Sequence, residues 1–301
     1  MIYTVTFNPA IDYVVQLSHP LMSGKINRNT KEDFQFGGKG INVSNVLKNL
    51  GFPNTALGFI AGFTGDALQK GLQDMGLSTQ FISVQEGMTR INVKVKADRE
   101  TEINGLGPVV TTADMDKLYV QLDTLKAGDV LVLSGSIPAC LPADTYKAIM
   151  ERLQGREICI VVDAAGALLL KVLPYHPFLI KPNNHELGEI FGTTPVTDEE
   201  ILEQARRLQA MGGRNILVSL AEDGALLLDE TGHGHRVSCP KGQVVNSVGA
   251  GDSMVAGFLA GWLESGDYTH ALKTGIAAGS ATAFNLGLAT GEQIRELMKS
   301  L

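Results

Sequence analysis

The most informative stretch of the chain reads Ser247-Val248-Gly249-Ala250-Gly251-Asp252-Ser253. After it, apolar residues recur with the spacing of a buried helical face until Gly266, at Met254, Val255, Phe258, Leu259, Trp262 and Leu263. Glycines before a helix allow a tight turn, and the free N–H groups of the first turn carry the positive end of the helix dipole. The stretch therefore predicts an anion-binding site at a helix N-terminus, preceded by a strand-like segment at residues 243–246.

Asp252 has two interpretations. An acidic residue in the first turn of a helix commonly does no more than complement the helix dipole. Beside a phosphate-binding turn, the same carboxylate can also act as a general base. The residues around it leave both interpretations open.

The composition is that of an ordinary globular protein. The 301 residues are 44% hydrophobic and 19% charged, which is enough for a full core in one or two domains. The net charge of −7 and the lack of a Lys/Arg run argue against nucleic acid as a partner, because nothing supplies a surface that follows a phosphate backbone. Solubility is the simpler explanation of the charge.

The cysteines and the N-terminus predict a soluble cytoplasmic protein. Cys140, Cys159 and Cys239 have no CxxC or metal-type spacing, and an odd number of dispersed thiols suits a reducing cytosol. Residues 1–7 lack the basic and long apolar regions of a signal peptide, and no apolar run reaches the roughly 18 residues of a membrane span. We expect no membrane partner.

A second glycine-rich turn, Gly37-Gly38-Lys39-Gly40, opens another predicted helix, which Gly51 ends. Lys39 and Asn42 lie at its N-terminal end, where a cation opposes the helix dipole. An unpaired Lys39 is therefore disfavoured, which makes a bound anion a plausible partner, and a solvated lysine in a flexible loop is the alternative. The turn lacks the G-x-x-x-x-G-K-[ST] spacing of a P-loop.

Three segments, at about residues 10–18, 30–36 and 90–104, are predicted to form a small β lid over the main sheet. The last of them alternates apolar and charged residues, which is typical of an antiparallel hairpin with one wet face. Asp12 either faces a ligand or satisfies the amides of a local turn. Arg90, at the base of the hairpin, is either a phosphate ligand or a solvated strand end.

From Val130 onward the chain alternates helical segments with short runs rich in Val, Ile and Leu. The runs lie at residues 130–133, 158–162, 178–180, 216–219 and 225–228. Runs without polar alternation are typical of a parallel sheet that is buried on both faces. The predicted fold class is therefore α/β, and polar residues after the strands indicate a ligand crevice at their carboxyl ends.

Two further groups of polar residues have competing interpretations. Asn183 and Glu186 match a helix capping box, and the alternative gives Glu186 a water-mediated hold on Mg²⁺. His233 and His235 lie between two predicted strands, and we interpret them as surface turn residues rather than as a metal site.

Two motifs together resemble the signatures of the pfkB (ribokinase-like) carbohydrate kinases: Gly37-Gly38-Lys39-Gly40 with Asn42, and Val248 to Ser253. The resemblance covers essentially the whole chain. It extends to shorter motifs at residues 8–12, 89–94, 134–138, 181–186 and 219–224. The Asn8-Pro9-Ala10-Ile11-Asp12 opening narrows it to the branch of the family that phosphorylates phosphosugars.

The resemblance implies a single ribokinase-like domain over residues 1–301, a three-layer α/β/α sandwich with a mostly parallel sheet and a small β lid. The lid often contributes to a homodimer interface in this family. The implied reaction converts fructose 1-phosphate and ATP, with Mg²⁺, to fructose 1,6-bisphosphate and ADP. Tagatose 6-phosphate, phosphorylated at C1, is the alternative acceptor.

The resemblance also implies roles for individual residues. Asp252 would accept the proton of the attacking hydroxyl, beside the amides of Gly249, Ala250 and Gly251 and a magnesium ion near Glu186. The residues that would hold the phosphosugar are Asp12, Gly38, Lys39, Asn42, Arg90, Asn104 and Ser134. Those that would line the nucleotide are Asn183, Ser219, Ala221, Glu222, Gly224 and Ala278. Ala221 departs from the pattern, since related sequences commonly have glycine there.

Two rival classes of protein remain. A hydrolase with Ser253 as nucleophile would need a histidine base, and nothing in the sequence places one of the six histidines beside it. A sugar-phosphate-binding regulator without catalysis would be expected to lack the base or the glycines, yet Gly249, Gly251 and Asp252 are all present.

Overall fold

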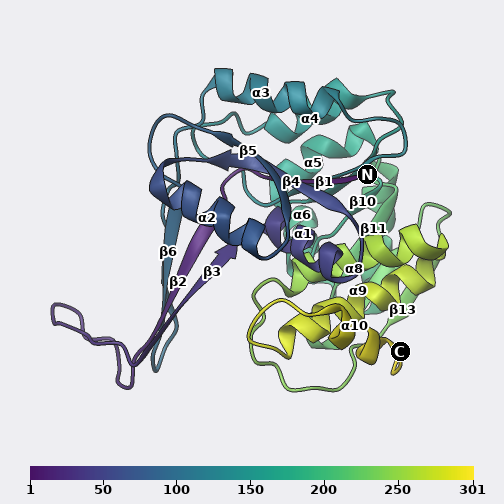
Figure 1. Cartoon of the computed structure of the whole chain (residues 1–301). Coiled ribbons are helices and arrows are strands. Elements are labelled where there is room, and N and C mark those ends of the chain that lie inside the picture. Colours follow the sequence, from purple (N-terminus) through teal and green to yellow (C-terminus); the bar gives the residue numbers. More distant parts are fainter.

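The computed structural model describes residues 1–301 and contains a large and a small sheet (Figure 1). The strands of the large sheet are β1 (Ile2–Thr6), β4 (Asn54–Ile60), β5 (Ser78–Ser83), β8 (Val130–Ser134), β9 (Cys159–Asp163), β10 (Leu179–Ile180), β11 (Asn215–Ser219), β12 (Ala225–Leu228) and β13 (Gly234–Val237). They follow the order β13-β12-β11-β10-β9-β8-β1-β4-β5. Only β12 runs antiparallel to its neighbours, so the predicted mostly parallel sheet is confirmed.

Helices cover both faces of the large sheet (Figure 1). One face is covered by α3 (Thr112–Asp123), α4 (Thr145–Leu153), α5 (Gly166–Val172), α6 (Asn184–Phe191) and α7 (Asp198–Ala210). The other is covered by α1 (Lys39–Asn49), α8 (Ala250–Ser265), α9 (Tyr268–Ala283) and α10 (Gly291–Met298). The predicted α/β/α sandwich is therefore confirmed, and two short 3₁₀ turns, at Leu173–Tyr175 and Ala221–Asp223, complete it.

The apolar runs of the sequence form strands because both faces of the sheet are buried. In β8, Leu131 and Leu133 pack into the core on the α3–α7 side, and Val130 and Val132 pack into the core on the α8–α10 side. Side chains alternate between the two faces of a strand, so a strand covered on both faces must be apolar throughout.

The small sheet is the predicted lid. It consists of β2 (Ala10–Gln16), β3 (Lys31–Gly37), β6 (Arg90–Lys96) and β7 (Thr101–Ile103), in the order β3-β2-β6-β7. It projects from the edge of the sandwich, and α2 (Gly62–Asp74) packs between it and the large sheet (Figure 1). The parallel pairing of β2 with β6 sets Asp12 opposite Asn92.

Three details differ from the predictions. Residues 243–246 form no strand, and the N–H groups of Val245 and Asn246 instead donate to the carbonyl of Ala283. Two edge strands, β5 and β13, were not predicted because polar residues interrupt their apolar pattern. His235 is not a surface turn residue, since it lies in β13 and its Nε2 is 2.8 Å from Oδ2 of the buried Asp229.

No helix combines the length and apolarity needed to cross a bilayer.

Candidate active site

The helix α8 begins where the sequence predicts an anion site. Gly249 is its N-cap residue and has a φ of 80°, a left-handed conformation that other residues rarely adopt. The N–H groups of Gly249, Gly251 and Asp252 donate no hydrogen bond within the protein. That of Ala250, which the sequence also places in the anion site, donates to the carbonyl of Ser247 at 3.2 Å. The remaining free donors form the positive end of the helix.

Asp252 is almost completely buried in the first turn of α8. Its Oδ2 accepts a 2.8 Å hydrogen bond from Nδ2 of Asn42. Burial, together with the nearby negative charge of Asp163, raises the pKa of Asp252 to about 6, against the opposing effects of Asn42 and of two lysines. Such a carboxylate is ionised at neutral pH and is more basic than an ordinary aspartate, which suits a general base.

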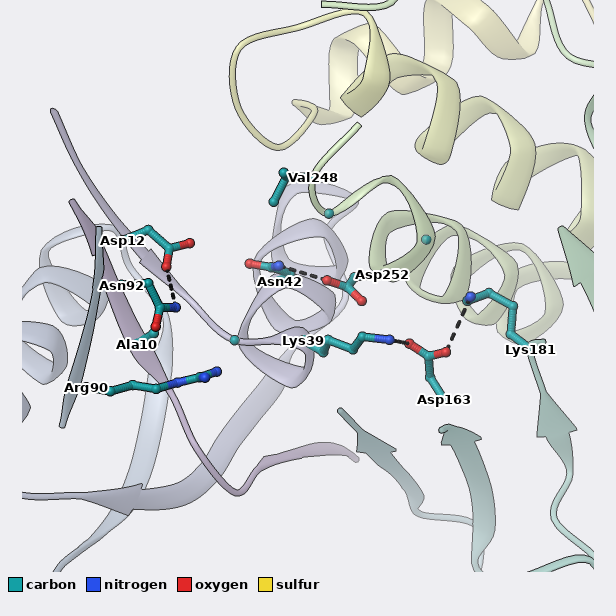
Figure 2. A pocket seen from close by; sticks show the side chains of 13 residues that line it. Ala10, Asp12, Lys39, Asn42, Arg90, Asn92, Asp163, Lys181, Val248 and Asp252 are labelled. Carbon is teal, nitrogen blue, oxygen red and sulfur yellow. Dashed lines mark hydrogen bonds and ion pairs between the residues drawn. The ribbon is translucent and has the colours of Figure 1, made fainter. Parts of the chain in front are cut away.

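A second helix, α1, brings its own N-terminus to the same place. Its N-cap Gly38 has a φ of 132°, and a Cβ there would lie 2.5 Å from Cγ2 of Thr6, so glycine is required on both counts. Close packing of this turn on β1 directs Lys39 and Asn42 toward the start of α8 (Figure 2). The two glycine-rich turns found in the sequence therefore converge in space.

Lys39 has an internal partner that the sequence analysis did not identify. Its Nζ lies 3.1 Å from Oδ2 of Asp163, the last residue of β9, and Nζ of Lys181 lies 3.3 Å from Oδ1 of the same carboxylate. Burial opposes the ionisation of Asp163, but the two lysines outweigh it and lower the pKa of Asp163. For Lys39, burial is again opposed, chiefly by Asp163 and Asp252, and its pKa is raised. Lys39 therefore has an acidic partner within the protein, in addition to the bound anion or the solvent that the sequence indicated.

The lid lies across from these two helix N-termini and contributes Asp12 and Arg90 to the site. Oδ1 of Asp12 accepts a 2.8 Å hydrogen bond from Nδ2 of Asn92, and Oδ2 lies 3.4 Å from Nζ of Lys94. Arg90 donates from Nε to the carbonyl of Asn8 at 3.2 Å, and no ion pair in the structure includes it. Burial lowers the pKa of Arg90, and Asp12 partly compensates. A partly buried guanidinium without a carboxylate partner is suited to an anionic ligand.

These side chains enclose a cavity of about 330 Å³ between the lid and the large sheet (Figure 2). Eight of the predicted site residues line it: Asp12, Gly38, Lys39, Asn42, Arg90, Gly249, Gly251 and Asp252. Five other lining residues were missed: Ala10, Asn92, Asp163, Lys181 and Val248. Asp163 and Lys181 carried one available signal, since each is a charged residue at the carboxyl end of an apolar strand.

Two predicted phosphosugar ligands do not line the cavity. Asn104 is exposed just beyond β7. Ser134, at the end of β8, is buried and its hydroxyl has no hydrogen-bond partner in the protein. The structure therefore does not bring either side chain to the cavity wall.

Asn183 and Glu186 form the capping box that the sequence predicts. Oδ1 of Asn183 accepts from the Glu186 N–H at 2.8 Å, and Oε2 of Glu186 accepts from the Asn183 N–H at 2.9 Å. Oε1 of Glu186 makes no hydrogen bond, and no cluster of three or more metal-binding side chains occurs in the chain. Magnesium in kinases is held mainly by phosphates and water with one or two carboxylates, so this single free oxygen fits such a role.

The remaining predicted nucleotide residues surround the loop after β11. Ala221 has a φ of 48°, which glycine adopts more readily, and Gly224 closes the loop by accepting from the Leu220 N–H. Ser219 is the last residue of β11, and Glu222 lies in the loop that follows it, at the carboxyl end of the sheet. Ala278 is fully buried, and its Cβ faces Gly257 of α8 in the packing between α8 and α9.

Residues 5–295 match the model of the pfkB family carbohydrate kinase, and the chain belongs to this family. It is 45% identical over 298 residues to the 1-phosphofructokinase of Bacillus subtilis (strain 168), which covers 99% of this chain and 97% of that protein. It is 38% identical over 289 residues to the D-tagatose-1-phosphate kinase of Bacillus licheniformis, covering 96% and 94%. The crystal structure of a putative phosphofructokinase from Staphylococcus aureus superposes with a TM-score of 0.89 at 41% identity, covering 99% and 97%.

The geometry agrees with a phosphotransferase and not with the rival hydrolase. The hydroxyl of Ser253 is fully buried and lies 2.8 Å from that of Thr282, and no histidine lines the cavity. A nucleophilic serine needs both access and a base. The chain is therefore a kinase that transfers a phosphoryl group to an alcohol.

Proposed function

We propose that this kinase phosphorylates the C6 hydroxyl of fructose 1-phosphate, giving fructose 1,6-bisphosphate. The observation that carries the proposal is the placement of a basic carboxylate, Asp252, across one cavity from the unpaired guanidinium of Arg90. A ketohexose monophosphate has an anionic end and a free primary hydroxyl at the other end, which matches this pair. The B. subtilis relative carries the name of the same activity.

In the proposed mechanism the phosphate of the sugar binds Arg90, and Asp12 and Asn42 accept or donate hydrogen bonds to the ring hydroxyls. Asp252 accepts the proton of the C6 hydroxyl as its oxygen bonds to the γ-phosphorus of ATP. The bond from that phosphorus to the β–γ bridging oxygen breaks, and ADP leaves with the electron pair. The free N–H groups of Gly249 and Gly251 stabilise the charge on the transferring group.

ATP is proposed to enter over the loop after β11, toward the start of α8. Asn183, Ser219 and the Ala221–Gly224 turn lie along this route, at the carboxyl ends of the strands where open α/β sheets bind ligands. Mg²⁺ would be held by the nucleotide phosphates and, through water, by Oε1 of Glu186, and it would neutralise phosphate charge.

The test is the release of ADP with Mg²⁺ and a panel of fructose 1-phosphate, fructose 6-phosphate, tagatose 1-phosphate and tagatose 6-phosphate. The two tagatose compounds are included because of the B. licheniformis relative and because the sequence leaves that acceptor open. We expect the highest kcat/KM with fructose 1-phosphate and a product that aldolase cleaves. The Asp252→Asn variant should lose about 10²- to 10⁴-fold in kcat while still binding the sugar. Turnover unchanged in this variant would refute the role of Asp252, and a regulator without catalysis would release no ADP at all.

We also propose that the protein is cytoplasmic and forms a homodimer through the lid. The lid is a four-stranded sheet whose ring pair, Tyr13 and Phe34, is stacked at 4.9 Å, and Phe34 is largely exposed. A second copy would cover this surface. The mass in solution, measured by light scattering, distinguishes a dimer from a monomer.

A further inference from the structure

The turn Ala221–Gly224 lies at the surface, so packing does not hold its conformation. Ala221, Glu222 and Asp223 are all exposed, between the largely buried strands β11 and β12. Ala221 has a φ of 48°, a left-handed conformation that is unfavourable for any residue other than glycine. A residue keeps such a conformation only where its surroundings fix it. The conformation of the turn must therefore be fixed by hydrogen bonds.

Two carbonyl groups of the turn accept hydrogen bonds from side chains that come later in the chain. Nη1 of Arg236 donates to the carbonyl of Asp223 at 2.7 Å, and Sγ of Cys239 lies 3.7 Å from the carbonyl of Ala221. The same thiol is 3.1 Å from Oγ of Ser280 in α9. A guanidinium is a strong donor and a thiol is a weak one. Arg236 is therefore the main side-chain support of the turn, and Cys239 supplements it.

The register of the β12–β13 hairpin brings these two side chains to the turn. Arg236 of β13 lies opposite Leu226 of β12, so the end of β13 returns to the start of β12. A Cβ at Gly224 would lie 2.2 Å from the carbonyl oxygen of Val237, so only glycine allows the two backbones to approach this closely. The turn therefore rests directly on the segment that carries Arg236 and Cys239.

The same arrangement leaves two amides of the turn free. The N–H groups of Ala221 and Glu222 donate no hydrogen bond within the protein. The turn follows β11 at the carboxyl end of the sheet, where open α/β sheets bind ligands. A nucleotide carries hydrogen-bond acceptors on its base, ribose and phosphates, so fixed amide donors suit it. A turn that is already ordered loses little conformational freedom when a ligand binds.

We propose that Arg236 and Cys239 are positioning residues that hold the turn Ala221–Gly224 in the conformation that binds ATP, an inference that rests on the nucleotide route proposed above. Neither side chain lines the cavity of the phosphosugar site. Both act through the turn, so their loss should weaken nucleotide binding and leave phosphosugar binding unchanged. Without them the nucleotide would have to order the turn as it binds, which lowers its affinity.

The test is Arg236→Met, which keeps the length of the side chain and removes its N–H donors. We expect the Kd of ADP, measured by calorimetry, to rise about 10-fold, because a hydrogen bond from a charged donor is lost. KM for ATP should rise in parallel, while kcat and KM for the phosphosugar stay within about 3-fold of wild type. Cys239→Ala should raise the Kd of ADP about 2- to 3-fold, and Cys239→Ser, which keeps a donor, should restore it.

Two controls separate the turn from the other ion pairs nearby. Asp198→Asn weakens the ion pair in which Nε of Arg236 lies 3.0 Å from Oδ2 of Asp198, and it leaves the hydrogen bond to Asp223 in place. Arg214→Met removes an ion pair with Glu230 near the other end of the hairpin. Both variants should bind ADP within about 2-fold of wild type, because exposed ion pairs contribute little and neither change touches the turn.

A double variant distinguishes positioning from a general loss of stability. Ala221→Gly makes the left-handed conformation at this position favourable without help from a side chain. Adding Ala221→Gly to Arg236→Met should therefore restore at least 3-fold of the lost ADP affinity. A merely structural role of Arg236 would show no such recovery.

The outcomes separate this inference from the proposed function. A Kd of ADP within about 2-fold of wild type in folded Arg236→Met overturns the role of Arg236. If that variant fails to fold, Arg236→Lys replaces it, since lysine keeps the charge beside Asp198 but lacks the fork of donors, and the Kd of ADP should rise at least 3-fold. Wild-type protein that binds no ADP overturns the nucleotide route and this inference with it. ADP binding without turnover of any phosphosugar overturns the proposed acceptor alone.

Discussion

The hydrogen bond from Asn42 to Asp252 gives a direct test of the general base. Nδ2 of Asn42 donates to Oδ2 of Asp252 at 2.8 Å, in a buried position, and this bond lowers the pKa of Asp252 from the value that burial alone would impose. The bond favours the ionised carboxylate. Replacing Asn42 with alanine removes the donor and leaves the carboxylate in place.

The size of the effect follows from the charge of the acceptor. A hydrogen bond to a charged group contributes about 1.5–3 kcal/mol, and one pKa unit corresponds to about 1.4 kcal/mol, so the pKa of Asp252 should rise by about 1–2 units. The base works only when it is ionised, so activity is lost as the pH falls through its pKa. With the pKa of Asp252 at about 6 in the wild type, the acid limb should move to about pH 7–8 in Asn42→Ala.

The assay is the pH profile of kcat/KM for fructose 1-phosphate, because this parameter reports the ionisations of the free enzyme. Asn92→Ala is the matched control: it removes a 2.8 Å amide hydrogen bond of the same kind, but to Asp12 on the lid. The control should lower the plateau of the profile and leave its acid limb in place. An acid limb at the same pH in wild type and in Asn42→Ala would refute the assignment of Asp252 as the titrating base.

Two other predictions test the lid and the far edge of the sheet. Arg90→Ala should raise KM for the phosphosugar about 100-fold or more and change KM for ATP little, because the variant loses a bidentate guanidinium contact with the phosphate of the sugar. Steady-state kinetics with each substrate varied in turn measures both KM values. Equal changes in the two KM values would contradict the role of Arg90. Asp229→Asn should lower the free energy of unfolding by about 2–4 kcal/mol at pH 7, because Asp229 accepts hydrogen bonds from Thr231, His233 and His235, and should not change kcat. These bonds lower the pKa of Asp229 from 3.8 to about 2 and outweigh burial, so the stabilisation is present above about pH 4 and disappears as the pH falls through 2. The free energy of unfolding of wild type and of Asp229→Asn, measured with urea, should differ less at pH 2.5 than at pH 7. The same difference at both pH values would contradict this role of Asp229.

The parts of the site that depend on local sequence could be predicted, and those that depend on strand register could not. Gly249 and Asp252 belong to one turn and one helix, so their relation is fixed by adjacent residues. Asp163 and Lys181 are adjacent only because β9 and β10 pair in one register, and neither strand carries a signal for that choice. His235 was misinterpreted for a similar reason, since its partner Asp229 becomes its neighbour only when the β12–β13 hairpin forms.

The charges around Asp252 explain how one cavity can bind two anionic substrates and still keep a usable base. Asp163 raises the pKa of Asp252 and, in the same position, anchors Lys39 and Lys181, which lower it. Without the lysines, burial and the charge of Asp163 would raise the pKa of Asp252 further and make its ionised form scarcer at neutral pH. Without Asp163, the two ammonium groups would repel each other and would fully stabilise the ionised Asp252, which would then be a weaker base. Burial is therefore the largest cause of the raised pKa of Asp252, and Asp163, which the sequence did not reveal, adds to it while its two lysine partners oppose it.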